Sequence, residues 1–232
     1  YNEIFDYCQD SDDMGAFYSY DQSYRMGGHT FAYNYIHDSP IGDGIYFDED
    51  HLNMKIYGNI VALNSDPKRR GTGFLYKSGT QAKGNAPIGM ECYNNIAINC
   101  NVGFQFLSLP SMIDSNKIYN NVSVYNGLAF RNRMLAANNK ERDTAFIPSP
   151  TASQNISYSE DPGFEDFNHF KFNLKKDAKI FKDLPSFKAI PFEKIGLMVD
   201  EYRKVLPTDK DLKKFNRNRQ TDKKGTDILD RG

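Results

Sequence analysis

Residues 95–99 read Asn-Ile-Ala-Ile-Asn, and this pattern of an asparagine followed by alternating small and β-branched residues recurs along the chain. The copies begin at Asn2, Asn34, Asn59, Asn95, Asn121 and Asn155, with 25 to 36 residues from one to the next. Internal repeats at this spacing indicate a solenoid, in which each repeat forms one turn and stacks on its neighbours.

A second segment follows each of the first five asparagine segments. It consists of a glycine and then an aromatic-rich run, and the glycines are Gly15, Gly44, Gly73, Gly103 and Gly127. Alternating apolar residues bounded by Asn and Gly are typical of β-strands and turns, and no helical period interrupts residues 1–160. We therefore predict an all-β fold, a right-handed parallel β-helix (a single-stranded solenoid) of about five to six turns.

The repeated asparagines and glycines have a structural explanation. An Asn amide can bond to the equivalent Asn one turn away, and Asn also tolerates the left-handed conformation at a corner. We expect the glycines to supply a positive φ at the next corner. Counting from each glycine places Tyr18 and Phe47 inside the solenoid, and Tyr46, Asp48 and Lys77 on its outer face.

The pattern changes after residue 160. We expect repeats over 1–160, a segment that caps the end of the core over 161–200, and a short helix with a charged, mobile tail over 201–232. A first turn without a cap would expose strand edges, so we also expect the chain to be the C-terminal part of a longer helix.

Composition narrows the functional classes. The chain has 232 residues, 39% of them hydrophobic, and a net charge of −1, which argues against a nucleic-acid-binding protein. No apolar run is long enough to span a membrane. The cysteines Cys8, Cys92 and Cys100 have no metal-ligand spacing, so we interpret Cys92 and Cys100 as small buried residues. Residues 1–50 carry eleven acidic residues against one base, Arg25. We therefore expect candidate functional residues at this end of the chain.

Several segments together resemble a known group of proteins. Residues 13–18 (Asp-Met-Gly-Ala-Phe-Tyr), 33–38 (Tyr-Asn-Tyr-Ile-His-Asp) and 44–49 (Gly-Ile-Tyr-Phe-Asp-Glu) are similar to a series in bacterial right-handed parallel β-helix proteins of the pectate-lyase-like superfamily. The nearest resemblance is to glycoside hydrolase family 141, and it covers roughly residues 1–200. It implies a secreted, periplasmic or cell-surface protein that acts on an oligo- or polysaccharide, and we expect a monomer.

The resemblance implies hydrolysis by two surface aspartates. Carried over, it assigns Asp48 to one role and Asp13 or Asp21 to the other. Equivalent side chains on adjacent turns lie about 5 Å apart, near the carboxyl separation of retaining glycosidases, whereas a wider gap suits inverting enzymes. Asp21 and Asp50 form a second possible pair. The expected substrate-binding residues are Tyr46, Glu49, Asp50, Lys77, Gln105, Arg131 and His37, although a packed or capping role is favoured for His37 over a proton shuttle.

Two other functions are compatible with the same fold. A polysaccharide lyase could use Lys77 as a base with Arg131 as its partner, or Ca²⁺ held by Asp48 and Asp50 on one strand face. A non-catalytic carbohydrate-binding or structural β-helix would need neither. For the hydrolase we expect no cofactor and no metal.

Overall fold

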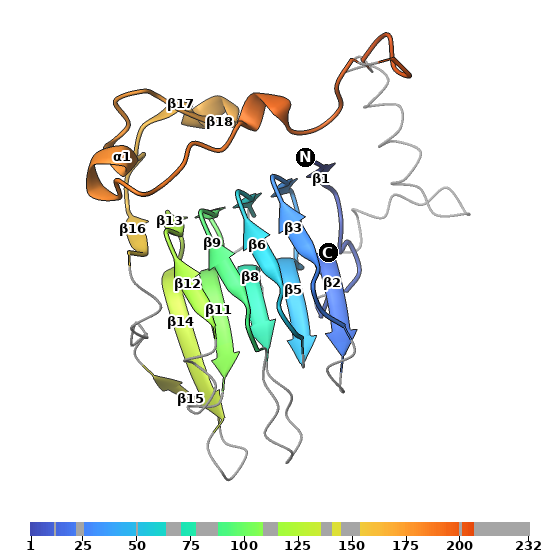
Figure 1. The fold of residues 1–232 in the computed structure, drawn as a ribbon, viewed down its shortest axis with the longest axis vertical. Coiled ribbons are helices and arrows are strands. Elements are labelled where there is room, and N and C mark those ends of the chain that lie inside the picture. Colours follow the sequence, from blue (N-terminus) through green and yellow to red (C-terminus); the bar gives the residue numbers. More distant parts are fainter. Residues whose placement is uncertain are drawn as a thin grey trace. The chain divides into compact units, whose positions relative to one another are not determined.

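The computed structural model describes residues 1–11, 13–21, 26–49, 51–63, 71–77, 88–108, 116–135, 141–144, 154–199 and 201–206. Three parallel sheets wind around one core and form a β-solenoid (Figure 1). Sheet 1 contains β1 (Glu3–Ile4), β4 (Tyr35–His37), β7 (Ile60–Ala62), β10 (Ile96–Ile98), β13 (Val122–Val124) and β16 (Ile156–Tyr158). The all-β, parallel prediction is confirmed.

The other two sheets differ in strand length. Sheet 2 has the long strands β2 (Gly15–Asp21), β5 (Asp43–Glu49), β8 (Thr72–Lys77), β11 (Val102–Ser108) and β14 (Leu128–Leu135), with β15 (Glu141–Thr144) antiparallel at its edge. Sheet 3 has β3 (Thr30–Ala32), β6 (Lys55–Tyr57), β9 (Glu91–Tyr93) and β12 (Lys117–Tyr119). Chain order therefore runs sheet 1, sheet 2, sheet 3 in each turn.

All three sheets continue together for about three turns, between β3 and β12. The expectation of five to six turns was too high. The copies that begin at Asn121 and Asn155 add β13 and β16 to sheet 1, but among the described residues they add no strand to sheet 3. Each copy of the sequence repeat corresponds to one strand of sheet 1. The number of copies is therefore larger than the number of turns to which all three sheets contribute a strand. The hand of the solenoid stays a prediction.

The repeated asparagines form a hydrogen-bonded ladder through the solenoid. Each amide Nδ2 donates to Oδ1 of the next member, at 2.9 Å for Asn2 to Asn34, 2.8 Å for Asn34 to Asn59, 2.9 Å for Asn59 to Asn95, and 3.0 Å for Asn95 to Asn121 and for Asn121 to Asn155. Their backbone N–H groups donate to the same oxygens. The predicted contact between equivalent asparagines is confirmed. The left-handed corner residues instead precede the ladder: Tyr33, Gly58, Asn94, Asn120 and Gln154.

The glycines of sheet 2 have a different purpose from the one expected. None of Gly15, Gly44, Gly73, Gly103 and Gly127 has a positive φ. A Cβ on Gly44 would lie 2.4 Å from the carbonyl oxygen of Gly73 and 2.5 Å from Cγ1 of Val61. Glycine is therefore required there because neighbouring backbone and side chains approach closely, and not because of a corner conformation.

The interior is filled by one side of sheet 2. Phe47, Phe74 and Phe104 are at most 1% exposed, and Phe74 stacks on Phe104 with ring centroids 4.7 Å apart. The first turn departs from the glycine count, because Gly15 lies opposite Asp43 rather than Gly44. This offset of one residue exchanges the two faces of β2, so the expectation that Tyr18 fills the core was wrong.

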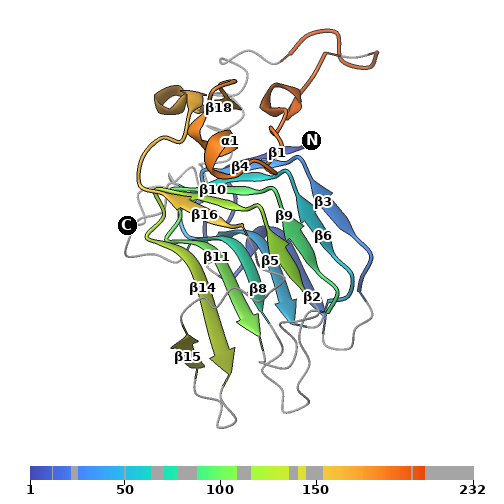
Figure 2. The same ribbon diagram turned by 60° about the vertical axis from the view of Figure 1, so that its left-hand side comes forward.

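The C-terminal segment lies along the side of the solenoid. It contains β17 (Phe164–Asp166), η2 (Phe167–His169), β18 (Lys171–Leu174), α1 (Lys179–Asp183) and η3 (Phe192–Lys194). Its apolar side chains pack on the outward residues of sheet 1, including Tyr35, Ile60 and Val124. The segment therefore covers the outer face of sheet 1 rather than the end of the core (Figure 2).

Residues from 197 onward belong to a second compact unit. Residues 201–206 form bends where the sequence predicted a short helix. The expected tail over 207–232 lies outside the described residues.

Candidate functional site

A cluster of charged and phenolic groups lies on the outer face of sheet 2. Asp48 near the end of β5 is level with Lys77 on β8 and with Tyr20 on β2, so side chains of three successive turns meet there. Asp48 is only 5% exposed, although its side chain leaves the interior. The predicted outward direction of Asp48 and Lys77 is confirmed.

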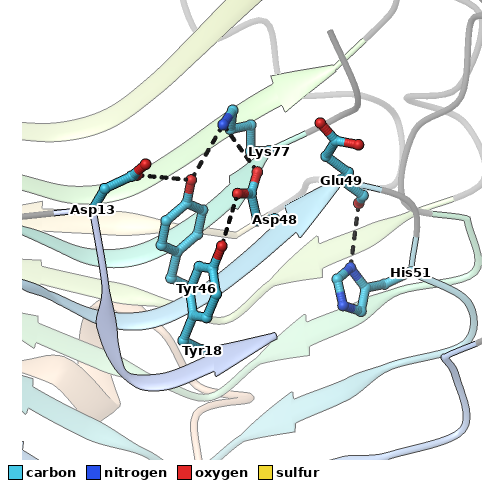
Figure 3. Close-up of polar contacts among 7 residues, drawn as sticks. All are labelled: Asp13, Tyr18, Tyr46, Asp48, Glu49, His51 and Lys77. Atoms are coloured by element: carbon cyan, nitrogen blue, oxygen red, sulfur yellow. Dashed lines mark hydrogen bonds and ion pairs between the residues drawn. The ribbon is translucent and has the colours of Figure 1, made fainter. Parts of the chain in front are cut away.

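Asp48 has one partner on each side. The Nζ atom of Lys77 lies 3.0 Å from Oδ1, and the hydroxyl of Tyr18 donates to Oδ2 at 3.1 Å (Figure 3). Oδ1 is buried, and among the described residues it has no hydrogen-bond partner beyond that ion pair. A carboxylate in this position depends on the lysine, since a buried charge is tolerated only with a close counter-charge.

The cluster continues from Lys77 to a second carboxylate. Nζ of Lys77 also donates to the Tyr46 hydroxyl at 3.4 Å, and that hydroxyl donates to Oδ1 of Asp13 at 3.3 Å (Figure 3). Laid end to end, these contacts hold the carboxylates of Asp13 and Asp48 within about 10 Å of each other, a limit that includes the carboxyl spacing of inverting glycosidases.

Both phenols of the cluster are strongly held in the neutral form. Burial and the charge of Asp48 raise the pKa of Tyr18 to about 12. Burial, followed by the charges of Asp48 and Asp13, raises the pKa of Tyr46 still further. At neutral pH each phenol is therefore a hydrogen-bond donor to the carboxyl oxygen that it contacts.

Two predicted site residues lie on the other side of β2 and β5. Asp21 is level with Glu49, and both are about 6% exposed. The carboxylate of Asp21 accepts a hydrogen bond from the backbone N–H of Met26 at 2.6 Å, which ties the end of β2 to that residue. Asp21 is level with Glu49, the residue after Asp48, and consecutive residues of a strand point to opposite faces. Asp21 and Asp48 therefore do not share a face. This argues for Asp13 as the partner of Asp48.

The remaining predicted residues are spread over three places. Gln105 and Arg131 continue the Tyr46 column of sheet 2, two and three strands away. His37 lies on sheet 1, where its ring contacts Asp38 and Glu3. Asp50 lies outside the described residues, and with it the proposed pairs that include it.

Tyr18 is the site residue that the sequence reasoning missed. Counting from Gly15 placed it inside, but its ring is 38% exposed and packs edge-on against Tyr46, with centroids 5.0 Å apart. A signal was present: aligning residues 17–21 (Phe-Tyr-Ser-Tyr-Asp) with 45–49 (Ile-Tyr-Phe-Asp-Glu) by their first tyrosines gives the observed register.

A search of the described residues finds no group of three or more His, Cys, Asp or Glu that could hold a metal ion. In the lyase alternative, Ca²⁺ would have needed Asp48, whose two oxygens already face Lys77 and Tyr18. The described part of the chain also contains no helix with the length and apolar character needed to cross a membrane.

Comparison with known proteins gives no relative: no protein-family model, no curated protein and no solved structure matches the chain. The resemblance to glycoside hydrolase family 141 therefore stays a prediction.

Proposed function

We propose that the protein is a glycan-degrading hydrolase whose site is the Asp48 cluster on sheet 2. The observation that carries the proposal is the unbroken series of contacts from Tyr18 through Asp48, Lys77 and Tyr46 to Asp13. Its two ends are exposed, Asp48 and Tyr46 are buried, and the Lys77 side chain is 27% exposed. Such a series can fix an acid and a base on either side of one bound sugar.

In this proposal the exposed ends contact the substrate. Asp13, when protonated, donates its proton to the glycosidic oxygen, and the bond from that oxygen to the anomeric carbon breaks. Tyr18 accepts a proton from the attacking water while it passes its own proton to Asp48, and the oxygen of that water bonds to the anomeric carbon. Asp48 is then a positioning residue that acts through Tyr18, because only the phenol is exposed.

The groups in the middle keep the ends in place. Lys77 compensates the charge of Asp48, and Tyr46 holds the Asp13 carboxylate. Tyr18 and Tyr20 are 38% and 47% exposed on this face, and their rings would stack on sugar rings. Direct attack of water in this proposal inverts the anomeric carbon, whereas the limit of about 10 Å between the carboxylates admits the spacings of both inverting and retaining enzymes and does not select one.

Release of reducing ends from a broad panel of polysaccharides tests the proposal. We expect Tyr18→Phe and Asp13→Asn each to lower kcat by about 10²- to 10⁴-fold, the usual contribution of a general acid or base. The matched control is Asp177→Asn, an exposed aspartate on the C-terminal segment, which should keep the wild-type rate.

Two outcomes would reject the hydrolase. One is the absence of any hydrolysis by the wild-type protein, and the other is a wild-type rate in Tyr18→Phe. Products that absorb in the near ultraviolet would indicate the lyase instead. The structure disfavours that alternative, because Lys77 has no free lone pair while it is paired with Asp48. Saturable glycan binding without turnover would leave the binding-module alternative.

A further inference from the structure

A separate pocket lies between the outer face of sheet 1 and the C-terminal segment. It encloses about 700 Å³, which is within the usual range for small-molecule sites. Tyr35 and His37 of β4 contribute to it from the sheet, and Phe172 of β18 and Phe192 of η3 contribute from the covering segment. None of the groups of the Asp48 cluster lines it, so it is a second site and does not depend on the proposed hydrolase.

Aromatic rings form much of its wall. Tyr35 meets Phe192 edge-on, with centroids 5.0 Å apart, and Phe172 packs edge-on against both. Tyr125 and Phe167, which also line the pocket, lie 5.2 Å apart. Rings in several orientations around one space present both faces and edges to whatever occupies it.

The charged groups of the pocket are predominantly acidic. Glu3 and Asp38 line it, with side chains 37% and 52% exposed, and His37 lies between them at 3.2 Å and 2.8 Å. Even with His37 protonated, two carboxylates face one cation. No lysine or arginine occurs among the described residues that line the pocket. The pocket is therefore short of one positive charge.

One lining residue is held in an unfavourable conformation. Phe170 has φ +57° in the left-handed region, and its ring is 56% exposed beside the pocket. A bulky residue pays a conformational cost there, and exposure of the ring adds to it. Phe170 ends η2, with its backbone N–H donating to the carbonyl of Phe167, and its ring meets Phe172 edge-on with centroids 6.3 Å apart. The rest of the ring is exposed and can contact a ligand in the pocket.

We propose that this pocket binds a small organic ammonium ion. The aromatic faces would hold the alkylated nitrogen by cation–π attraction, and Glu3 and Asp38 would supply the opposing charge. Neutral sugars lack the charge, and inorganic cations lack the apolar surface that the rings would cover. The two features of the pocket together therefore select the organic cation.

Isothermal titration calorimetry with choline tests this inference. The matched ligand is dimethylbutanol, which replaces the quaternary nitrogen of choline by carbon and has the same shape. We expect saturable binding of choline and binding of the neutral isostere weaker by about tenfold or more. Co-sedimentation with phosphatidylcholine vesicles then distinguishes the sources: protein in the pellet assigns the ammonium to a lipid headgroup, and protein in the supernatant to a free ligand.

Two substitutions locate the site. Phe170→Gly removes a ring that is more than half exposed, together with its edge contact to Phe172, and Asp38→Asn removes one charge at an exposed position. Each should weaken choline binding about fivefold to tenfold. Tyr202→Ala, at an aromatic residue that is 90% exposed and outside the lining, should leave the affinity unchanged.

The inference fails if choline shows no saturable binding to the folded wild-type protein. It also fails if the neutral isostere or methyl glucoside binds as tightly as choline, since charge would then have no part in recognition. Unchanged affinity in both Phe170→Gly and Asp38→Asn would likewise reject this pocket. Neither Phe170 nor Asp38 belongs to the Asp48 cluster, so their substitution should leave hydrolysis unchanged. Failure of the choline proposal is therefore distinguishable from failure of the hydrolase proposal.

Discussion

The asparagine ladder and the Asp48 cluster are two sets of polar groups that the same solenoid buries in different ways. The ladder is neutral, recurs in every turn, and satisfies each amide through the next one. The Asp48 cluster is charged, occurs once, and leaves Oδ1 of Asp48 with an ion pair alone. A repeated and satisfied polar group is what a scaffold needs, whereas a single charged group with an incomplete set of partners suggests a function.

Substitution in the middle of the ladder should have the largest effect on stability. In Asn95→Ala, the backbone N–H and Nδ2 of Asn59 lose their acceptor, and the carbonyl of Ile56 loses a donor, all in the buried core. We expect a loss of about 3–5 kcal/mol in the free energy of unfolding, since several buried groups lose their partners. Urea denaturation followed by far-ultraviolet circular dichroism measures it.

The control is the first member of the same ladder. Asn2 is exposed, and in the ladder its side chain only donates, so Asn2→Ala should cost less than about 1 kcal/mol. Equal losses of stability in Asn95→Ala and Asn2→Ala would show that the buried hydrogen bonds of the ladder stabilise the fold no more than the exposed ones.

A smaller loss of stability is expected from a substitution in the charged Asp48 cluster than from one in the neutral asparagine ladder. Lys77→Met removes the cation beside Asp48 and should lower the free energy of unfolding by about 1–2 kcal/mol, a value reduced from that of a fully buried pair because the lysine side chain is 27% exposed. The same urea titration measures this loss.

Lys117→Met provides a matched comparison. Lys117 also pairs with an acid one turn away, Glu91 at 3.4 Å, but its side chain is 60% exposed. We expect a change of about 0–0.5 kcal/mol. If both lysine variants lost the same stability, the Asp48 cluster would be no more than an ordinary surface ion pair.

The smallest expected effect is a change in the pKa of Tyr18. The pKa of Tyr18 rises from 10.0 to about 12, first because of burial and then because of Asp48. The unfolded chain therefore loses this proton before the folded protein does, and stability falls as the pH rises from 10 towards 12. Asp48→Asn removes the second cause and should move the midpoint back towards 10. The tyrosinate absorbance of each protein, minus that of its Tyr18→Phe counterpart, gives this midpoint. A midpoint that does not change in Asp48→Asn would mean that the two groups do not interact in solution.

Local patterns in the sequence were sufficient for the parallel solenoid and for the stacking of its asparagines. Recurrence of one residue type at a fixed place in each repeat can satisfy buried amides only when equivalent positions lie in register. The outward direction of Asp48 and Lys77 followed from strand alternation alone. Alternation failed at Tyr18, because it depends on a starting point and Gly15 is one residue out of phase with Gly44.

Other errors came from contacts between residues that are far apart in sequence. His37 was expected among the substrate-binding residues of the Asp48 site, yet β4 and β5 belong to different sheets. The aromatic pocket beside His37 needs Phe170 and Phe192, which are more than a hundred residues away, and no repeat pattern connects them to β4.

The amino-acid sequence by itself determined the repeat, the strand chemistry and the acidic character of the first turns, because these depend on residue type and on spacing within one turn. Only the tertiary structure decided which acids meet, which phenol lies between them and which face the C-terminal segment covers. Those outcomes depend on the register between turns and on packing across long separations, where a shift of one residue exchanges the inside of a strand for its outside.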